Sequence, residues 1–286
     1  MRWEGNRESG NVEDQRSAGG GMLGGRSVGI GTIVIALVGG WIFGINPLTI
    51  LSMLSGGSPA QVQQGPAQRP PADDTMARFV STVLADTEDV WKVVFSQSGA
   101  TYQEPKLVLF RGAVATACGQ GQSAMGPFYC PSDQKVYIDL DFYETLKNRL
   151  GAPGDFAQAY VISHEVGHHV QNLMGITGKM EQLRPRASKV EYNAMSVRLE
   201  LQADCFAGLW ANHAQKARSI LEQGDIEEAM NAAQKIGDDA LQQKSQGRIV
   251  PDSFTHGTSA QRARWFNTGL QSGQVKACDT FAARQL

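Results

Sequence analysis

Positive charge is scarce in this sequence. Its 26 Lys and Arg residues are outnumbered by 28 Asp and Glu residues, which gives a formal net charge of −2 over 286 residues. The cations are scattered, and no run of them alternates with aromatic residues. The chain therefore lacks the basic surface that nucleic-acid binding requires, and we expect no nucleic-acid partner.

Cysteine is also scarce. The four cysteines are Cys118, Cys130, Cys205 and Cys278, and no two of them form a Cys-x-x-Cys pair, which argues against cysteine as a zinc ligand. An even number suits disulfides instead, and four cysteines allow three connectivities. We expect Cys118 with Cys130 first, because twelve residues suit a hairpin-like loop, which leaves Cys205 with Cys278.

The chain before residue 74 has too little apolar content for a folded core, apart from one segment. Residues 1–26 mix both charges and end in glycine runs, so we expect a flexible cytoplasmic tail. Residues 27–46 carry no charge and are rich in Ile, Val, Leu, Ala and Gly, which predicts a transmembrane anchor. Residues 47–73 are rich in Gly, Pro and Gln, and this composition is typical of a linker.

The charges around the apolar segment predict its orientation. Arg16 and Arg26 precede it, and the next cation is Arg69. The positive-inside rule then predicts a single-pass protein of the inner (cytoplasmic) membrane, with a cytoplasmic N-terminus and a periplasmic or otherwise extracytoplasmic catalytic domain. Disulfides fit that oxidising location. A cleaved signal peptide is the alternative, although the apolar region is long and begins late.

Residues 74–286 are expected to form one folded domain of the α+β class, predominantly helical with a small sheet. Hydrophobic periodicity predicts an amphipathic helix over residues 75–96, and short strands are predicted at 106–110, 126–130 and 136–139. Further helices are predicted over 155–175, 191–215 and 225–246, with a last one that begins at Thr258 or Ser259.

The motif with the clearest chemistry is His164-Glu165-Val166-Gly167-His168, in a helix that we expect Asp155 to cap. In a helix, His164 and His168 share one face, so their imidazole nitrogens reach a single Zn²⁺ ion. Glu165 adjoins the first ligand, where it can take a proton from water and deliver it to a leaving amine. The alternative is a helix with two histidines that bind no metal.

A third ligand is predicted in Glu200-Leu201-Gln202-Ala203-Asp204. Glu200 and Asp204 are four residues apart, so they lie on one face of the predicted helix. Glu200 can complete a site of two histidines and one carboxylate with the fourth position open for water. Asp204 would accept the other ring N–H of one histidine and fix its orientation. The alternative is two carboxylates on a solvated helix face.

These motifs resemble the gluzincin arrangement of thermolysin-like metallopeptidases, while Gln171 and Met174 exclude the extended metzincin pattern. More closely, the chain resembles a bacterial family of membrane-anchored neutral zinc metallopeptidases. The matching segments are Met1 to Trp3, Asn11 to Asp14, Gly126 to Pro131, His164 to His169, Glu200 to Cys205 and Phe254 to Thr258. The resemblance implies a zincin-like metallopeptidase domain preceded by one transmembrane helix, and it supplies no substrate.

Two further expectations concern the substrate. By resemblance, an edge strand before the zinc helix pairs with the extended peptide, and either Tyr129-Cys130 or Val136-Tyr137-Ile138 can serve. A peptidase also needs a donor to the oxyanion formed by the attacking water. His256, in a loop beside Gly257, is the candidate, with Arg262 and Tyr192 behind it. An ordinary loop histidine is the alternative.

Together these features predict a membrane-anchored, zinc-dependent endopeptidase that acts outside the inner membrane. Its partners would be a peptide or protein substrate and, through the N-terminal helix, the membrane. One alternative is a membrane-tethered zinc-binding interaction module without catalytic activity, in which four protein ligands would close the zinc site. Another is a peptidase that acts on cell-wall crosslinks.

Overall fold

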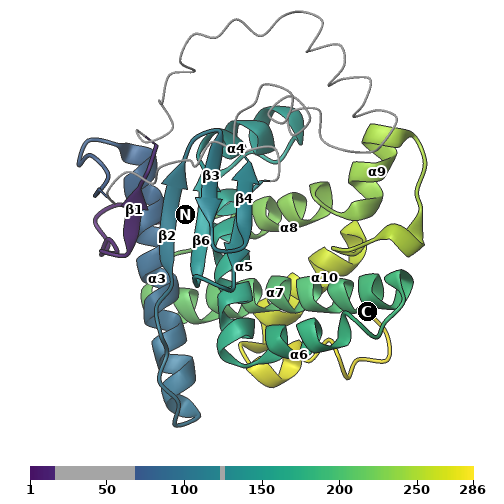
Figure 1. Cartoon of the computed structure of the whole chain (residues 1–286). Helices are drawn as coiled ribbons and strands as arrows, with labels where there is room; N and C mark the ends of the chain where they lie inside the picture. Colours follow the sequence, from purple (N-terminus) through teal and green to yellow (C-terminus); the bar gives the residue numbers. More distant parts are fainter. Residues whose placement is uncertain (17–67, 123–125) are drawn as a thin grey trace, which may run out of the picture.

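A computed structural model of the chain describes residues 1–16, 68–122 and 126–286. Helices predominate in these residues, with a small sheet beside them, as the sequence predicts (Figure 1). The strands are β1 (Val12–Asp14), β2 (Lys106–Phe110), β3 (Ala113–Thr116), β4 (Gly119–Gln122), β5 (Phe128–Cys130) and β6 (Lys135–Asp139). The α-helices are α3 (Thr75–Gln97), α4 (Asp141–Glu144), α5 (Asp155–Leu173), α6 (Ile176–Leu183), α7 (Lys189–Arg218), α8 (Asp225–Lys235), α9 (Asp238–Gln246) and α10 (Ser259–Ser272).

The larger sheet has the strand order β1-β2-β6-β5. The β1–β2 and β2–β6 pairs are parallel, and β5 is antiparallel to β6. Strand β6 is paired on both sides, so the segment Val136-Tyr137-Ile138 cannot accept a further strand. Among the strands that the structure describes, β5 pairs only with β6 and so forms an edge of the sheet.

Side-chain alternation divides the sheet into two faces. Leu107 and Ile138 point into the main core, which they share with α3 and α5. Val108 and Tyr137 point to the other face and form a smaller cluster with Val114 of the β3–β4 hairpin. The helices therefore cover one face of the sheet and the hairpin covers part of the other.

The prediction of a flexible N-terminal tail is wrong for residues 1–16. Strand β1 pairs in parallel with β2, and Trp3 packs edge-on against Phe79 of α3, with ring centroids 5.4 Å apart. The sequence of this segment is too polar to suggest a core element, and its order comes from partners more than fifty residues away. The folded unit thus includes residues 1–16 as well as the domain predicted from residue 74.

Glu13 on β1 adds charge pairing to this docking. Its carboxylate oxygens lie 2.7 Å from Lys135 Nζ and 3.0 Å from Lys106 Nζ. Burial alone would raise the pKa of Glu13, but the hydrogen bonds from the two lysines outweigh burial and lower it below 4.5.

The predicted transmembrane helix and the single-pass inner-membrane location must be corrected. The long described helices α3, α5 and α7 all carry charged side chains, and no helix in the described part of the chain is long and apolar enough to cross a membrane. Residues 27–46 and most of the predicted linker lie outside the described residues.

Helices α7 and α10 cross with their backbones in contact. A Cβ added at Gly208 would lie 1.9 Å from Phe266 O, and one added at Gly269 would lie 1.8 Å from Cys205 O. Only glycine fits at either position. This close crossing brings side chains of α10 up to the inner face of α7, beside the site described below.

Candidate metal centre

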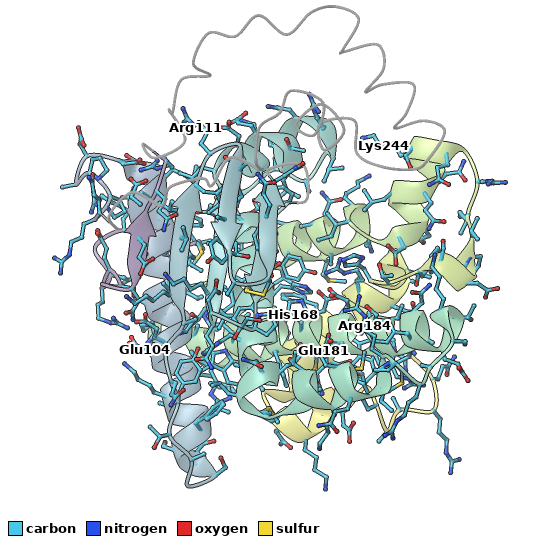
Figure 2. All side chains as sticks on the ribbon, viewed as in Figure 1. Glu104, Arg111, His168, Glu181, Arg184 and Lys244 are labelled. Atoms are coloured by element: carbon cyan, nitrogen blue, oxygen red, sulfur yellow. A yellow bond between two sulfur atoms is a disulfide. The ribbon has the colours of Figure 1, made fainter. Side chains whose placement is uncertain are left out.

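Helix α5 carries the two histidines of the motif. It begins after Gly154, whose φ of 118° suits glycine, so Gly154 and not Asp155 is the capping residue. His164 and His168 lie one turn apart on one face, with ring centroids 4.8 Å apart. In Figure 2 the labelled His168 lies near the middle of the molecule, far from the peripheral Arg111 and Lys244.

Helix α7 brings Glu200 to these rings. Glu200 Oε2 lies 3.2 Å from His164 Nε2, and Glu200 Oε1 lies 3.5 Å from His168 Nε2. One ligand atom from each of the three residues lies within 4.8 Å of the other two. Gly167 permits this approach, because a Cβ there would lie only 3.1 Å from the backbone of Ala203. Two imidazoles and one carboxylate are a donor set that suits Zn²⁺ with a fourth position left open.

His164 is oriented by a buried polar network, in which Asp204 is the central acceptor. Asp204 Oδ1 lies 2.8 Å from His164 Nδ1 and accepts a 2.5 Å hydrogen bond from the Tyr160 hydroxyl. Arg262 of α10 donates to both carboxylate oxygens from Nε and Nη2, each at 2.9 Å. Arg262, which the sequence analysis named after His256 as a candidate oxyanion donor, therefore directs its Nε and Nη2 groups to Asp204.

His168 is oriented by a second chain, which the sequence analysis missed. Gln171 Oε1 lies 2.9 Å from His168 Nδ1, and Gln171 Nε2 donates to Leu199 O at 2.7 Å and to Gln202 Oε1 at 3.1 Å. Gln202 Nε2 in turn donates to Cys278 O at 3.0 Å. Gln171 lies three residues after His168, one helical turn on, and this spacing was the available signal.

The charges around the histidines favour a cation. Burial alone would lower the pKa of His164, but Asp204 and Glu200 outweigh it and raise the pKa to about 10. The pKa of His168 is likewise raised, chiefly because Glu200 outweighs burial. Burial raises the pKa of Glu200, but His168 and His256 lower it well below 4.5 overall. Positive charge is thus stabilised at the ring nitrogens, which is where a metal ion would replace the protons.

Glu165 faces the same space without a partner. Its side chain is buried, and no hydrogen-bond donor from the described residues reaches its Oε2. Burial raises the pKa of Glu165 above 4.5, although the imidazoles of His168 and His164 oppose this shift. A buried carboxylate oxygen without a protein partner is suited to bind a water or a substrate proton at this position.

A cavity of about 870 Å³ opens onto these residues. The wall includes His164, Glu165, His168, Glu200 and His256, together with residues Gly126 to Tyr129 and Pro131. Apolar side chains such as Phe142, Leu150 and Leu241 line much of the rest. Its shape and lining suit an organic ligand with an apolar part.

His256 lies in a loop before α10, as expected, with its side chain half exposed. Asp238 holds this loop, since its Oδ2 accepts hydrogen bonds from the backbone amides of Thr255, His256 and Gly257. His256 Nδ1 lies 3.4 Å from Asp238 Oδ1. Burial alone would lower the pKa of His256, but Glu200 and Asp238 raise it overall. Tyr192 packs instead against the Arg184 guanidinium and is not part of the cavity wall.

His169 does not face the metal ligands. Its ring is buried, Nε2 lies 2.6 Å from Gln103 O, and Nδ1 lies 3.0 Å from the Tyr129 hydroxyl. Burial lowers the pKa of His169 below 6.5. It is a hydrogen-bonded histidine, as its position off the metal face suggests.

Both disulfides have the predicted connectivity. Cys118 is bonded to Cys130, which ties the β3–β4 hairpin to strand β5. Cys205 is bonded to Cys278, which ties the C-terminal segment to α7 beside Asp204. The second bond also places Cys278 O where it accepts the hydrogen bond from Gln202.

Comparison with known proteins places this site in a family. A family described as "Putative neutral zinc metallopeptidase" matches residues 1–281. The Escherichia coli K12 protein named "Uncharacterized protein YpfJ" is 54% identical over 289 aligned positions, which cover 98% of this chain and 99% of the relative. A Mycobacterium tuberculosis H37Rv protein, "Uncharacterized protein Rv2575", is 42% identical over 219 positions, or 73% of each chain. No solved structure matches significantly. The chain belongs to the neutral zinc metallopeptidase family.

Proposed function

We propose that this protein is a zinc-dependent endopeptidase. The observation that carries the proposal is the convergence of three ligand atoms, from His164, His168 and Glu200, within 4.8 Å of one another beside the buried, unpartnered oxygen of Glu165. A purely structural metal site has no use for such a base. Because β1 belongs to the sheet, we assign the activity to the full chain and not to residues 74–286 alone.

His164, His168 and Glu200 would hold the zinc ion. When bound, zinc acts as a Lewis acid that polarises the scissile carbonyl and lowers the pKa of water. Asp204 and Gln171 accept the N–H groups of the two imidazoles on the side away from Glu200, which fixes the ring orientation and makes the rings better ligands.

Glu165 is the proposed general base and acid. Its raised pKa brings it nearer to neutrality, where a carboxylate accepts a proton from attacking water and then donates it to the leaving amine. The unpartnered Oε2 leaves that oxygen available for both transfers. His256, on the cavity wall, is the proposed donor to the oxyanion, and Asp238 holds its loop in place.

The proposed substrate is an extended segment of peptide or protein. Strand β5 has a free edge, and its residues Phe128 and Tyr129 belong to the wall of the cavity that contains Glu165. A peptide that adds to this edge would satisfy the free backbone groups of β5 and pass the site in an extended conformation.

The test compares three forms of the full chain: wild type, Glu165→Gln and Glu200→Ala. Zinc content is measured by elemental analysis, and cleavage is measured with casein, an unstructured protein. We expect one zinc per chain and cleavage in the wild type, zinc without cleavage in Glu165→Gln, and loss of zinc in Glu200→Ala. A wild type that keeps zinc and cuts neither casein nor crosslinked cell-wall peptide would instead support a non-catalytic zinc-binding module.

A further inference from the structure

The hydroxyl group of Tyr129 joins the edge strand β5 to the ligand helix α5. It lies 3.0 Å from His169 Nδ1, and it accepts a hydrogen bond from Asn172 Nδ2 at 3.1 Å. Gln103 O can only accept, so His169 Nε2 carries a proton and donates to it at 2.6 Å. Since the Tyr129 oxygen accepts from Asn172 and lies 3.0 Å from His169 Nδ1, one continuous chain of hydrogen bonds runs from Asn172 through Tyr129 and His169 to Gln103.

The elements joined by this chain form two sides of the active-site cavity. Tyr129 is the middle residue of β5 and belongs to the cavity wall. His169 directly follows the metal ligand His168 on α5, which also carries Glu165. The distance between β5 and α5 thus decides how far a peptide on the free edge lies from the Glu165 carboxylate.

The rest of β5 is held against other parts of the sheet region. Cys130 is tied to Cys118 of the hairpin, and Phe128 stacks on Tyr137 of β6, with centroids 5.0 Å apart. Neither contact involves α5. Within the described residues, Tyr129 and Asn172 make the side-chain hydrogen bonds that join the β5 region to α5. Asn172 also donates weakly to Pro131 O at 3.4 Å.

We propose that Tyr129 and His169 are positioning residues that fix the register of β5 relative to Glu165. Their role is to hold β5 where it binds substrate residues on one side of the scissile bond, so loss of the hydrogen bond should weaken the binding of those residues. This inference rests on the proposed peptidase function. It implies a substrate that extends several residues along β5, so cleavage should depend on peptide length on that side.

The test uses full-length, zinc-loaded protein and the substitution Tyr129→Phe, which removes the hydroxyl and keeps the ring. A preferred cleavage site in casein is mapped by mass spectrometry. A 12-residue peptide is then synthesised with about four residues or more on either side of the scissile bond. Two shorter versions lack residues from the N-terminal or the C-terminal end. The matched control is Tyr143→Phe, because the buried Tyr143 hydroxyl has no hydrogen-bond partner among the described residues and lies outside the cavity wall.

We expect Tyr129→Phe to raise KM for the long peptide by about tenfold, with kcat changed by less than about twofold. The truncation that removes the residues paired with β5 should raise KM in the wild type. It should also abolish the effect of Tyr129→Phe, because both changes remove the interaction between the peptide and a correctly placed β5. Tyr143→Phe should leave all three peptides unaffected. Peptide affinity in a Glu165→Gln background, measured by fluorescence anisotropy, should fall by the same factor without turnover, and His169→Phe should repeat the pattern.

Two results would overturn the inference while the peptidase function stands. An unchanged KM for the long peptide would show that the hydroxyl does not position β5. An equal loss on all three peptides would show a general structural effect. A wild type that cleaves no peptide would refute the proposed function itself, and this inference with it.

Discussion

The crossing of α7 and α10 predicts a large effect from one added methyl group. At Gly208, a Cβ would lie 1.9 Å from Phe266 O and 2.7 Å from Leu270 N, whereas real Cβ atoms essentially never approach another atom within 3.0 Å. Both neighbours are backbone atoms, so no side-chain rotation relieves the overlap. Gly208→Ala must therefore move α10 away from α7 by about 1 Å or more.

That movement reaches the network around the candidate metal centre. Arg262 lies on α10 and Asp204 on α7, and the two hydrogen bonds between them are each 2.9 Å long. A further separation of about 1 Å would break both hydrogen bonds and leave the buried Asp204 carboxylate without its positive partner. Breaking a buried ion pair costs about 3–5 kcal/mol, and overpacking alone costs about 1–3 kcal/mol. We expect a loss of at least about 3 kcal/mol, which lowers Tm by about 6–12 °C for a domain of this size.

Thermal unfolding followed by circular dichroism measures this effect. The matched control is Gly178→Ala in α6, where an added Cβ meets no atom within 4 Å and should raise stability by about 0.4–1 kcal/mol. Gly208→Ala should also weaken zinc binding, because His164 loses its fixed orientation. A Gly208→Ala protein that melts within about 2 °C of the wild type would refute the close crossing, since that shift corresponds to less than 1 kcal/mol.

Three other predictions address separate parts of the molecule. Gln171→Leu removes the acceptor of the His168 N–H and should weaken zinc affinity by about 10–100-fold in a chelator competition assay, while unchanged affinity would exclude this role. Because the pKa of Glu13 is lower in the folded chain, the unfolded chain binds the Glu13 proton first as pH falls. The stability that ionised Glu13 contributes is therefore present above pH 4.5 and is lost as pH falls through the folded pKa. The free energy of unfolding in urea should fall with pH in the wild type and fall less in Glu13→Gln. The same pH dependence in both proteins would contradict this role of Glu13. Replacing Cys205 and Cys278 together by Ala opens a 73-residue loop and should cost about 4 kcal/mol in denaturant unfolding, so an unchanged midpoint would contradict the stabilising role of this bond.

Local patterns in the sequence predict most of the elements that carry the site. The helix expected over 155–175 is α5, and the helix expected over 191–215 lies within α7. Strand β2 has the predicted bounds, and the capping box of Thr258 and Gln261 begins α10. In each case the signal is contained in a few neighbouring residues, because periodicity and capping are local properties.

Local sequence patterns do not predict contacts between segments that are distant in the sequence. The helix expected over 225–246 is two helices, α8 and α9, separated by Ile236 and Gly237, where the backbone of Gly237 is extended (ψ 145°). Glycine is required there because Ser259 N lies 2.5 Å from the position of an added Cβ. Gly224 caps the first of them. Arg262 meets Asp204 only because α10 returns to α7 58 residues later. Such partners depend on the packed fold, which no local pattern specifies.

The central claim is that His164, His168 and Glu200 hold one zinc ion and leave a position open for water. X-ray absorption spectroscopy of the full-length protein, loaded with one zinc per chain, tests it directly. The account predicts nitrogen and oxygen ligands at about 2.0–2.2 Å, with two imidazoles and at least one ligand that exchanges with solvent. Zinc–sulfur distances of about 2.3 Å, or four protein ligands with no exchangeable position, would contradict it.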